Sequence, residues 1–283
     1  LVGSSQEDID AVVSWLEEHG ITNHKLGGNK DFIIFETTIA KLTSLLHVRF
    51  YDFQRASDKR IHTTSIHAYS VPMVLKDSID IITGIRGFPL EKITPTIKTA
   101  GGPPPIGPKE IRARYNVTVE GKNSKNSQAV AEFQDQFFSP DDLKTFWSQY
   151  VKTGNTDDSI TKTVGQNSPS SPGIEASLDV QYIMGMAQGV PTWFWSNPNF
   201  DFWSDLTAWM EQVDSTSNAP WVFSVSYGSQ GNYPSTSYRT RLDAEFQKQG
   251  TRGISIIFAS GDRGVGCLSC NQFQSSFPAT SIY

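Results

Sequence analysis

Two carboxylic acids, Glu175 and Asp179, stand four residues apart in the segment GIEASLDVQY (residues 173–182). Residues at this spacing are neighbours on a helix surface, where like charges are mildly destabilising. The rest of the segment is strongly apolar, and a helix of that composition is mostly buried. Partial burial alters the protonation of a carboxyl pair, which suits acid–base catalysis. The pair therefore marks a candidate catalytic site, although acidic pairs on solvated helix faces are also common.

The remaining sequence narrows the chemistry to carboxyl groups. All five histidines precede residue 91, so the later part holds no Ser-His-Asp triad and no histidine zinc site unless the first part lends a histidine. Cys267 and Cys270 have the spacing of half a zinc site, but no second cysteine pair exists, which favours structural thiols. Glu175, Asp179 and Asp262 remain for acid–base work.

Composition and proline content describe the organisation of the chain. The net charge of −5 without a basic block argues against nucleic acid or an anionic membrane as partner, and no apolar run is long enough to span a bilayer. Six of the 15 prolines lie in residues 87–108, which is typical of a stiff linker. We therefore expect a small domain over residues 1–90, a linker over 91–108 and a larger domain over 109–283.

Hydrophobic patterns predict a different architecture for each domain. The first should be an α+β unit, with a hairpin turning at residues 27–29. Its predicted helices cover residues 5–19, 38–47 and 75–85, and its predicted strands cover 48–55 and 61–71. The second alternates strands with helices, which indicates an α/β fold with a doubly wound parallel sheet. Sites in such sheets lie at the carboxyl ends of strands, here after Ser226 and at Ser260-Gly261-Asp262.

Three motifs carry a resemblance to a known family. GIEASLDVQY, SVSYG (224–228) and FASGD (258–262) resemble, in this order and at similar separations, segments of the sedolisins, the serine-carboxyl peptidases. The likeness is greatest to the tripeptidyl-peptidase I branch. It implies a subtilisin-like fold, incomplete at the C-terminus, in which residues 1–90 are the later part of a propeptide. By this resemblance, Glu175 is the general base for a serine nucleophile, Asp179 orients Glu175, and Asp262 belongs to the oxyanion hole.

The resemblance also implies partners and a setting. The expected activity is hydrolysis of peptide bonds in acid, with removal of tripeptides from N-termini, in a lysosome or outside the cell. The propeptide would act as an intramolecular inhibitor on a protein that otherwise binds peptide or protein substrates. The family binds calcium, but its calcium site is C-terminal and so missing here, and no cofactor is expected within this chain. Asn116-Val117-Thr118 is a glycosylation sequon that a secretory chain could use.

Two departures from the family pattern leave alternatives open. The chain ends at Tyr283 without the GTSAS-like nucleophile motif of the family. This predicts either a fragment that is inactive alone or a catalytically inactive binding or regulatory chain. Arg263 replaces a residue that is usually small in relatives, and a cation beside Asp262 would favour its ionised form. A glycosidase using Glu175 and Asp179 as paired acids is a further alternative, although one helix supplying both acids is geometrically awkward.

Overall fold

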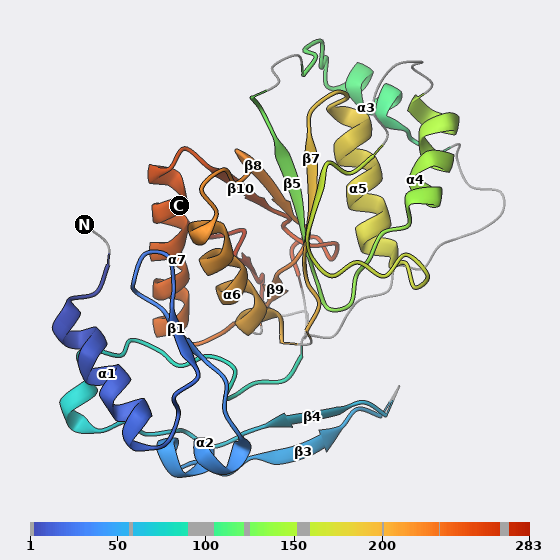
Figure 1. Ribbon diagram of the computed structural model, residues 1–283. Coiled ribbons are helices and arrows are strands. Elements are labelled where there is room, and N and C mark those ends of the chain that lie inside the picture. The colour runs from blue at the N-terminus through green and yellow to red at the C-terminus, as the bar shows by residue number, and fades with distance from the viewer. Residues whose placement is uncertain are drawn as a thin grey trace. The chain divides into compact units, whose positions relative to one another are not determined.

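The computed structural model describes residues 3–56, 59–89, 105–121, 125–151, 159–199, 201–231, 233–266 and 272–283. The chain divides into two compact units, which are described separately (Figure 1). Unit 1 consists of Leu1–Pro89, Asp201–Ala219 and Pro234–Gln249, and unit 2 consists of Leu90–Phe200, Pro220–Tyr233 and Gly250–Tyr283. No helix in the described ranges has both the length and the hydropathy to cross a bilayer.

Unit 2 is built on a five-stranded parallel sheet with the strand order β10-β8-β5-β7-β6. Its strands are β5 (Gln128–Phe133), β6 (Lys162–Gly165), β7 (Thr192–Asn197), β8 (Val222–Val225) and β10 (Ser255–Phe258). Every residue of β5 and β7 is buried, as expected for central strands of a parallel sheet. The predicted α/β fold with a parallel sheet is therefore confirmed.

Three helices of unit 2 lie beside this sheet (Figure 1): α3 (Pro108–Arg114), α4 (Pro140–Phe146) and α5 (Ile174–Met186). A π-helix, Trp147–Val151, continues α4. Val130 of β5 and Phe194 of β7 pack with Ala176, Val180 and Met184 of α5 in one hydrophobic core. This packing fixes the rotation of α5 and so determines which of its side chains remain away from the core. Two short strands, β9 (Ser229–Gln230) and β11 (Ser276–Phe277), form an antiparallel pair.

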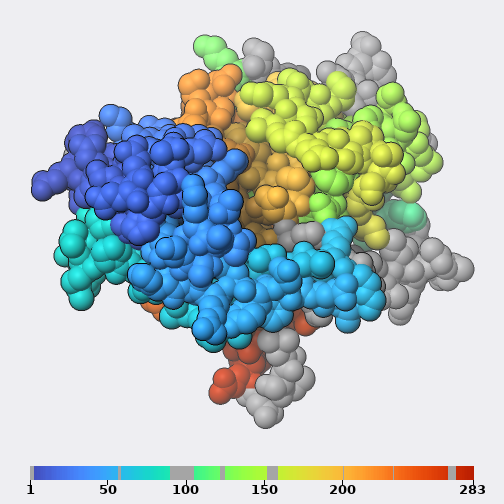
Figure 2. All heavy atoms as spheres, turned by 60° about the horizontal axis from the view of Figure 1, so that its bottom comes forward, coloured from blue at the N-terminus to red at the C-terminus, as the bar shows by residue number. Residues whose placement is uncertain are grey.

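Unit 1 combines small antiparallel strand pairs with helices. Ser5 caps the first helix by accepting a hydrogen bond from the Asp8 amide, and β1 and β2 form the predicted hairpin. The β3–β4 pair lies at the surface, where its light-blue atoms can be followed in Figure 2. The elements are α1 (Gln6–Glu18), β1 (His24–Leu26), β2 (Ile33–Phe35), α2 (Ile39–Leu46), β3 (Tyr51–Gln54), β4 (Ile61–Thr64), the 3-10 helix η1 (Met73–Leu75), α6 (Phe202–Ser215) and α7 (Thr236–Thr251).

The predicted helix over residues 75–85 is wrong. The structure has only η1, after which the chain continues in turns and bends. The Ser78 hydroxyl donates to Asp8 of α1 (2.6 Å), and the Ile82 amide donates to the Tyr69 hydroxyl (3.0 Å). The Tyr69 hydroxyl thus satisfies the Ile82 amide, which a helix would have paired internally. The apolar positions still face the core, since Leu75 and Ile85 are buried.

Unit 1 brings the loop between β1 and β2 against α6 and α7. The Gly28 amide donates a hydrogen bond to Ser215 Oγ at the end of α6 (3.2 Å). Helices α6 and α7 group with residues 1–89, so the two compact units are not continuous stretches of the chain. The domain limits 1–90, 91–108 and 109–283 stay a prediction. Most of the linker, residues 90–104, lies outside the described residues.

Replacing Gly28 with alanine is expected to destabilise unit 1. An added Cβ would lie 2.8 Å from Ser215 Oγ and 3.0 Å from Ser215 Cα, so helix backbone would have to move. Overpacking of this kind costs about 1–3 kcal/mol. Gly250 is the control, because a Cβ there meets nothing within 4 Å. Urea unfolding should show a lower midpoint for Gly28→Ala only, and an unchanged midpoint would contradict the tight approach.

Candidate active site

Helix α5 carries two of the three predicted catalytic residues. It begins after Gly173, and the amide of Glu175 in its first turn donates to Gln136 Oε1 (3.0 Å). A Cβ at position 173 would lie 2.2 Å from the same Gln136 oxygen, so any other residue there would displace the Gln136 side chain. Glu175 and Asp179 are half-buried, and each is followed in the helix by a core residue, Ala176 or Val180.

Asp179 is held by residues from two strands of the sheet. Its Oδ2 accepts a hydrogen bond from the hydroxyl of Ser226, the first residue after β8 (2.5 Å). The buried carboxyl group of Glu132 on β5 is close enough to influence its protonation. Burial raises the pKa of Asp179, and the hydrogen bond from Ser226, followed by the interaction with Glu132, partly opposes this rise.

Glu132 is the most deeply buried acid of the site, with no exposed surface. Its Oε2 accepts from the Tyr227 hydroxyl (3.0 Å), which also lies 3.0 Å from the Phe133 carbonyl oxygen. Burial raises the pKa of Glu132 well above its usual value, and the charges of Asp179 and Glu175 raise it further. Two neighbouring buried carboxyl groups disfavour the state in which both are ionised. We call Glu132, Glu175 and Asp179 the carboxyl cluster.

Asp262 lies at the same edge of the sheet but apart from this cluster. It follows β10, which pairs with β8 in parallel register, and the Ala259 amide donates to the Val225 carbonyl (3.0 Å). Asp262 and Ser226 therefore both follow the carboxyl ends of adjacent strands. Asp262 is exposed, and within the described residues no hydrogen bond or ion pair joins it to the cluster or to Arg263. Its part in an oxyanion hole stays a prediction.

Sequence reasoning missed Glu132 and Tyr227 and treated Ser226 as structural. The signal for Glu132 was present, because it is the only charged residue in the apolar strand segment QAVAEF. An ionisable residue in a strand buried on both faces needs a partner. Tyr227 gave no comparable signal, because a tyrosine at the end of a strand is common in cores. Only the three-dimensional structure shows that Ser226 binds Asp179, that Glu132 lies near Asp179, and that Tyr227 binds Glu132.

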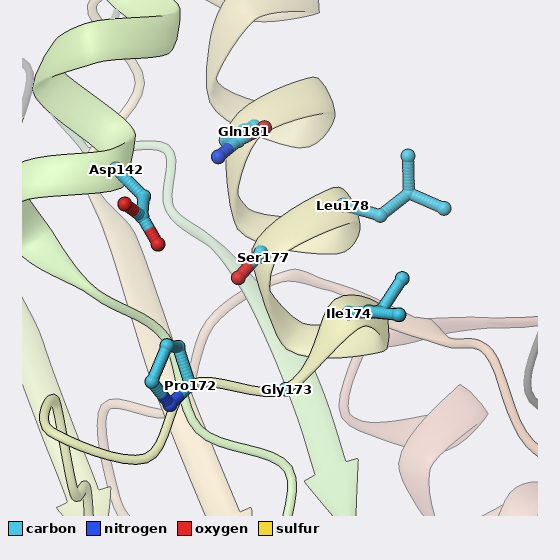
Figure 3. A pocket seen from close by; sticks show the side chains of 7 residues that line it. All are labelled: Asp142, Pro172, Gly173, Ile174, Ser177, Leu178 and Gln181. Atoms are coloured by element: carbon cyan, nitrogen blue, oxygen red, sulfur yellow. The ribbon is translucent and has the colours of Figure 1, made fainter. Parts of the chain in front are cut away.

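A surface pocket of about 360 Å³ opens beside the first turns of α5 (Figure 3). Asp142 of α4 and Ser177 and Gln181 of α5 point toward the space between the two helices, whereas Ile174 and Leu178 point away from Asp142. Ile174 and Leu178 are 46% and 49% exposed and adjoin Glu175 in the helix. The lining residues are Asp142, Pro172, Gly173, Ile174, Ser177, Leu178 and Gln181.

Among the described residues, no three His, Cys, Asp or Glu side chains are grouped so that they could hold a metal ion. The calcium that the resemblance implies was expected outside this chain and stays a prediction. Cys267 and Cys270 lie outside the described residues.

Comparisons with known proteins define the class. Residues 1–88 match the family "Pro-kumamolisin, activation domain". A sedolisin from Pseudomonas, described as a serine-carboxyl proteinase, shares 19% identity and a TM-score of 0.47, covering 62% of this chain and 51% of its own. The match of residues 1–88, together with the tripeptidyl-peptidases 1 described next, confirms the sequence-based resemblance to the sedolisins.

The particular relatives are tripeptidyl-peptidases 1. The protein from Dictyostelium discoideum is 33% identical over 319 aligned residues, which cover 98% of this chain and 53% of the relative. The human protein is 32% identical over 302 aligned residues, which cover all of this chain and 53% of the relative. The chain is therefore homologous to these enzymes over its whole length and spans about half of theirs.

Proposed function

We propose that this chain supplies the general base and the oxyanion group of an acid-acting serine-carboxyl peptidase that removes tripeptides from N-termini. The observation that carries the proposal is the carboxyl cluster, in which Asp179 is fixed by Ser226 and Glu132 one helical turn from Glu175. Homology to tripeptidyl-peptidases 1 supports the choice of a peptide substrate.

Each residue has a defined part in the reaction. Glu175 accepts the hydroxyl proton of a serine nucleophile as the serine oxygen attacks the peptide carbonyl. No residue of this chain is assigned as that nucleophile. Glu175 then returns the proton to the amine as the C–N bond breaks. Asp179 is a positioning residue that orients Glu175, and Glu132 holds Asp179. Protonated Asp262 donates a hydrogen bond to the developing oxyanion.

The raised pKa values in the carboxyl cluster are consistent with catalysis at acid pH. Burial raises the pKa of both Glu132 and Asp179, which favours their protonated forms as the pH falls. A carboxylate base is most effective when its pKa lies near the operating pH. We therefore propose an acidic compartment, lysosomal or extracellular, as the working site, and residues 1–88 as an intramolecular inhibitor until they are removed.

The direct test is a pH–rate profile with peptides that carry either a free or an acetylated N-terminus. The expected kcat/KM rises from neutral pH toward about pH 4–5, because a carboxylate base is most effective when the pH is near its pKa. Release of tripeptides from free N-termini, with little cleavage of acetylated peptides, is the expected product pattern. An optimum at about pH 7–8 would show that other groups carry the reaction. Hydrolysis of glycosides, but not peptides, would favour the paired-acid glycosidase.

A further inference from the structure

The first amides of α5 need hydrogen-bond acceptors from outside the helix. A polar side chain at the N-cap position usually supplies one. The N-cap residue of α5 is Gly173, which has no side chain that could accept. The acceptor comes instead from a distant part of the chain, because the Glu175 amide donates to Gln136 Oε1 (3.0 Å), across 39 positions of sequence.

The side chain of Gln136 is fixed in this position by its surroundings. It is 5% exposed, and its Nε2 donates to the Asp135 carbonyl oxygen (3.3 Å), so both ends of the amide group have partners. The amide group also lies against Gly173, where an added Cβ would come within 2.2–2.4 Å of its carbon, oxygen and nitrogen. The Gly173 amide donates to the Phe137 carbonyl oxygen (2.8 Å), which joins the two segments a second time.

The turn that carries Gln136 has an unusual backbone. Gln134 and Asp135 both have positive φ, 53° and 57°, in the left-handed region that residues other than glycine rarely adopt. Such conformations are costly, persist only where the surrounding structure determines them, and cluster at functional sites. The Gln136 amide closes the turn by donating to the carbonyl oxygen of Phe133, the last residue of β5 (3.2 Å). The turn thus ties Gln136 to the end of a fully buried strand.

The same short segment serves both acids of α5. Glu132, near the end of β5, influences the protonation of Asp179, and Gln136 holds the backbone at Glu175. Because the strand is buried and its turn is hydrogen-bonded, residues 132–136 are a firm support for the first two turns of the helix.

We propose that Gln136 is a positioning residue, which caps the first turn of α5 and so fixes the backbone from which the Glu175 carboxyl group projects. This role rests on the proposed function, in which Glu175 is the general base. Helix ends fray, and a base in the first turn moves with that turn. A displacement of about 1 Å in a catalytic group can cost about 100-fold in rate.

Amide hydrogen exchange in the whole chain, followed by NMR, tests the cap without any hydrolysis. Gln136→Met keeps the length of the side chain but removes the acceptor. Protection of the Glu175 amide should therefore fall roughly 2- to 10-fold relative to that of the Val180 amide in the same helix. General destabilisation would not lower this ratio, because it would affect the Val180 amide at least as strongly.

Two variants make the exchange result specific. Gln136→Glu keeps an acceptor oxygen at the same place, so it should restore most of the protection of the Glu175 amide. Gln166→Met makes the same substitution at an exposed glutamine of unit 2, and its ratio should equal that of the wild type. An unchanged ratio in Gln136→Met would show that this side chain is not the cap, and would overturn the proposal.

The positioning role is tested in an enzyme that also carries the serine nucleophile. Gln136→Met should lower kcat roughly 10- to 100-fold with little change in KM, and Gln136→Glu should recover most of this loss. In a Glu175→Gln background, Gln136→Met should cause no additional loss, because changes that act through one group are not additive.

A lower protection ratio with wild-type kcat in Gln136→Met would overturn the proposal, because the cap would then support the fold without positioning the base. A full additional loss in the Glu175→Gln background would overturn it as well. Failure of the proposed function is seen separately, as a wild-type rate in Glu175→Gln alone. That result would overturn the catalytic role of Gln136, while the exchange ratio would still decide whether it is the cap.

Discussion

In an enzyme that also carries the serine nucleophile, replacing Glu175 with glutamine is expected to lower kcat for peptide hydrolysis by about 100- to 10,000-fold, the usual contribution of a general base. Glutamine has almost the same shape but cannot accept the proton of a serine hydroxyl. The backbone contact with Gln136 is unaffected, because it uses the amide of residue 175. The KM should therefore change little, and the circular dichroism spectrum and unfolding midpoint should match those of the wild type.

Two further variants make the Glu175 result specific. Asp141→Asn removes a carboxylate whose side chain is 94% exposed, and its rate should equal that of the wild type. Asp262→Asn should cost less than Glu175→Gln, because an amide N–H can still donate to an oxyanion. If Glu175→Gln keeps more than about a tenth of the wild-type kcat, another group is the base.

The sheet of unit 2 could be predicted because its signals are local. The strands around Val130, Phe194 and Phe223 are short apolar runs bounded by polar or turn residues. Those around Val130 and Phe194 are buried along their whole length, which favours that composition. The position of α5 followed from the same reasoning, since Gly173 and Pro172 mark its start. Strand order, in contrast, depends on which surfaces pack together, and only the structure shows that β5 lies between β7 and β8.

The errors have a common cause in long-range contacts. Residues 75–85 have apolar spacing suited to a helix, yet Ser78 and Ile82 make hydrogen bonds to Asp8 and Tyr69, far away in sequence. Glu132 stands alone in its strand, and its partners Tyr227 and Asp179 come from segments 95 and 47 residues further along. Local patterns predicted which residues are buried, but not which polar groups satisfy one another across the fold.

Glu132 also governs how the stability of unit 2 should depend on pH. Burial raises the pKa of Glu132 well above its ordinary 4.5, so the folded state binds this proton more tightly than the unfolded state. The resulting stabilisation is fully present below about pH 4.5 and is lost as pH rises toward the folded-state pKa. Glutamine at position 132 has no proton to lose, and its amide can still donate to Asp179 and accept from Tyr227.

We therefore expect Glu132→Gln to flatten the loss of stability between about pH 5 and 8. The wild-type free energy of unfolding should fall more steeply than that of the variant, by up to about 1.4 kcal/mol per pH unit. Glu245 also has a raised pKa, but it titrates in both proteins, so the difference between the two curves reports Glu132 together with its neighbour Asp179. Urea unfolding at four pH values gives both curves, with Glu18→Gln as the exposed control. Parallel curves would mean that Glu132 keeps an ordinary pKa in the folded protein.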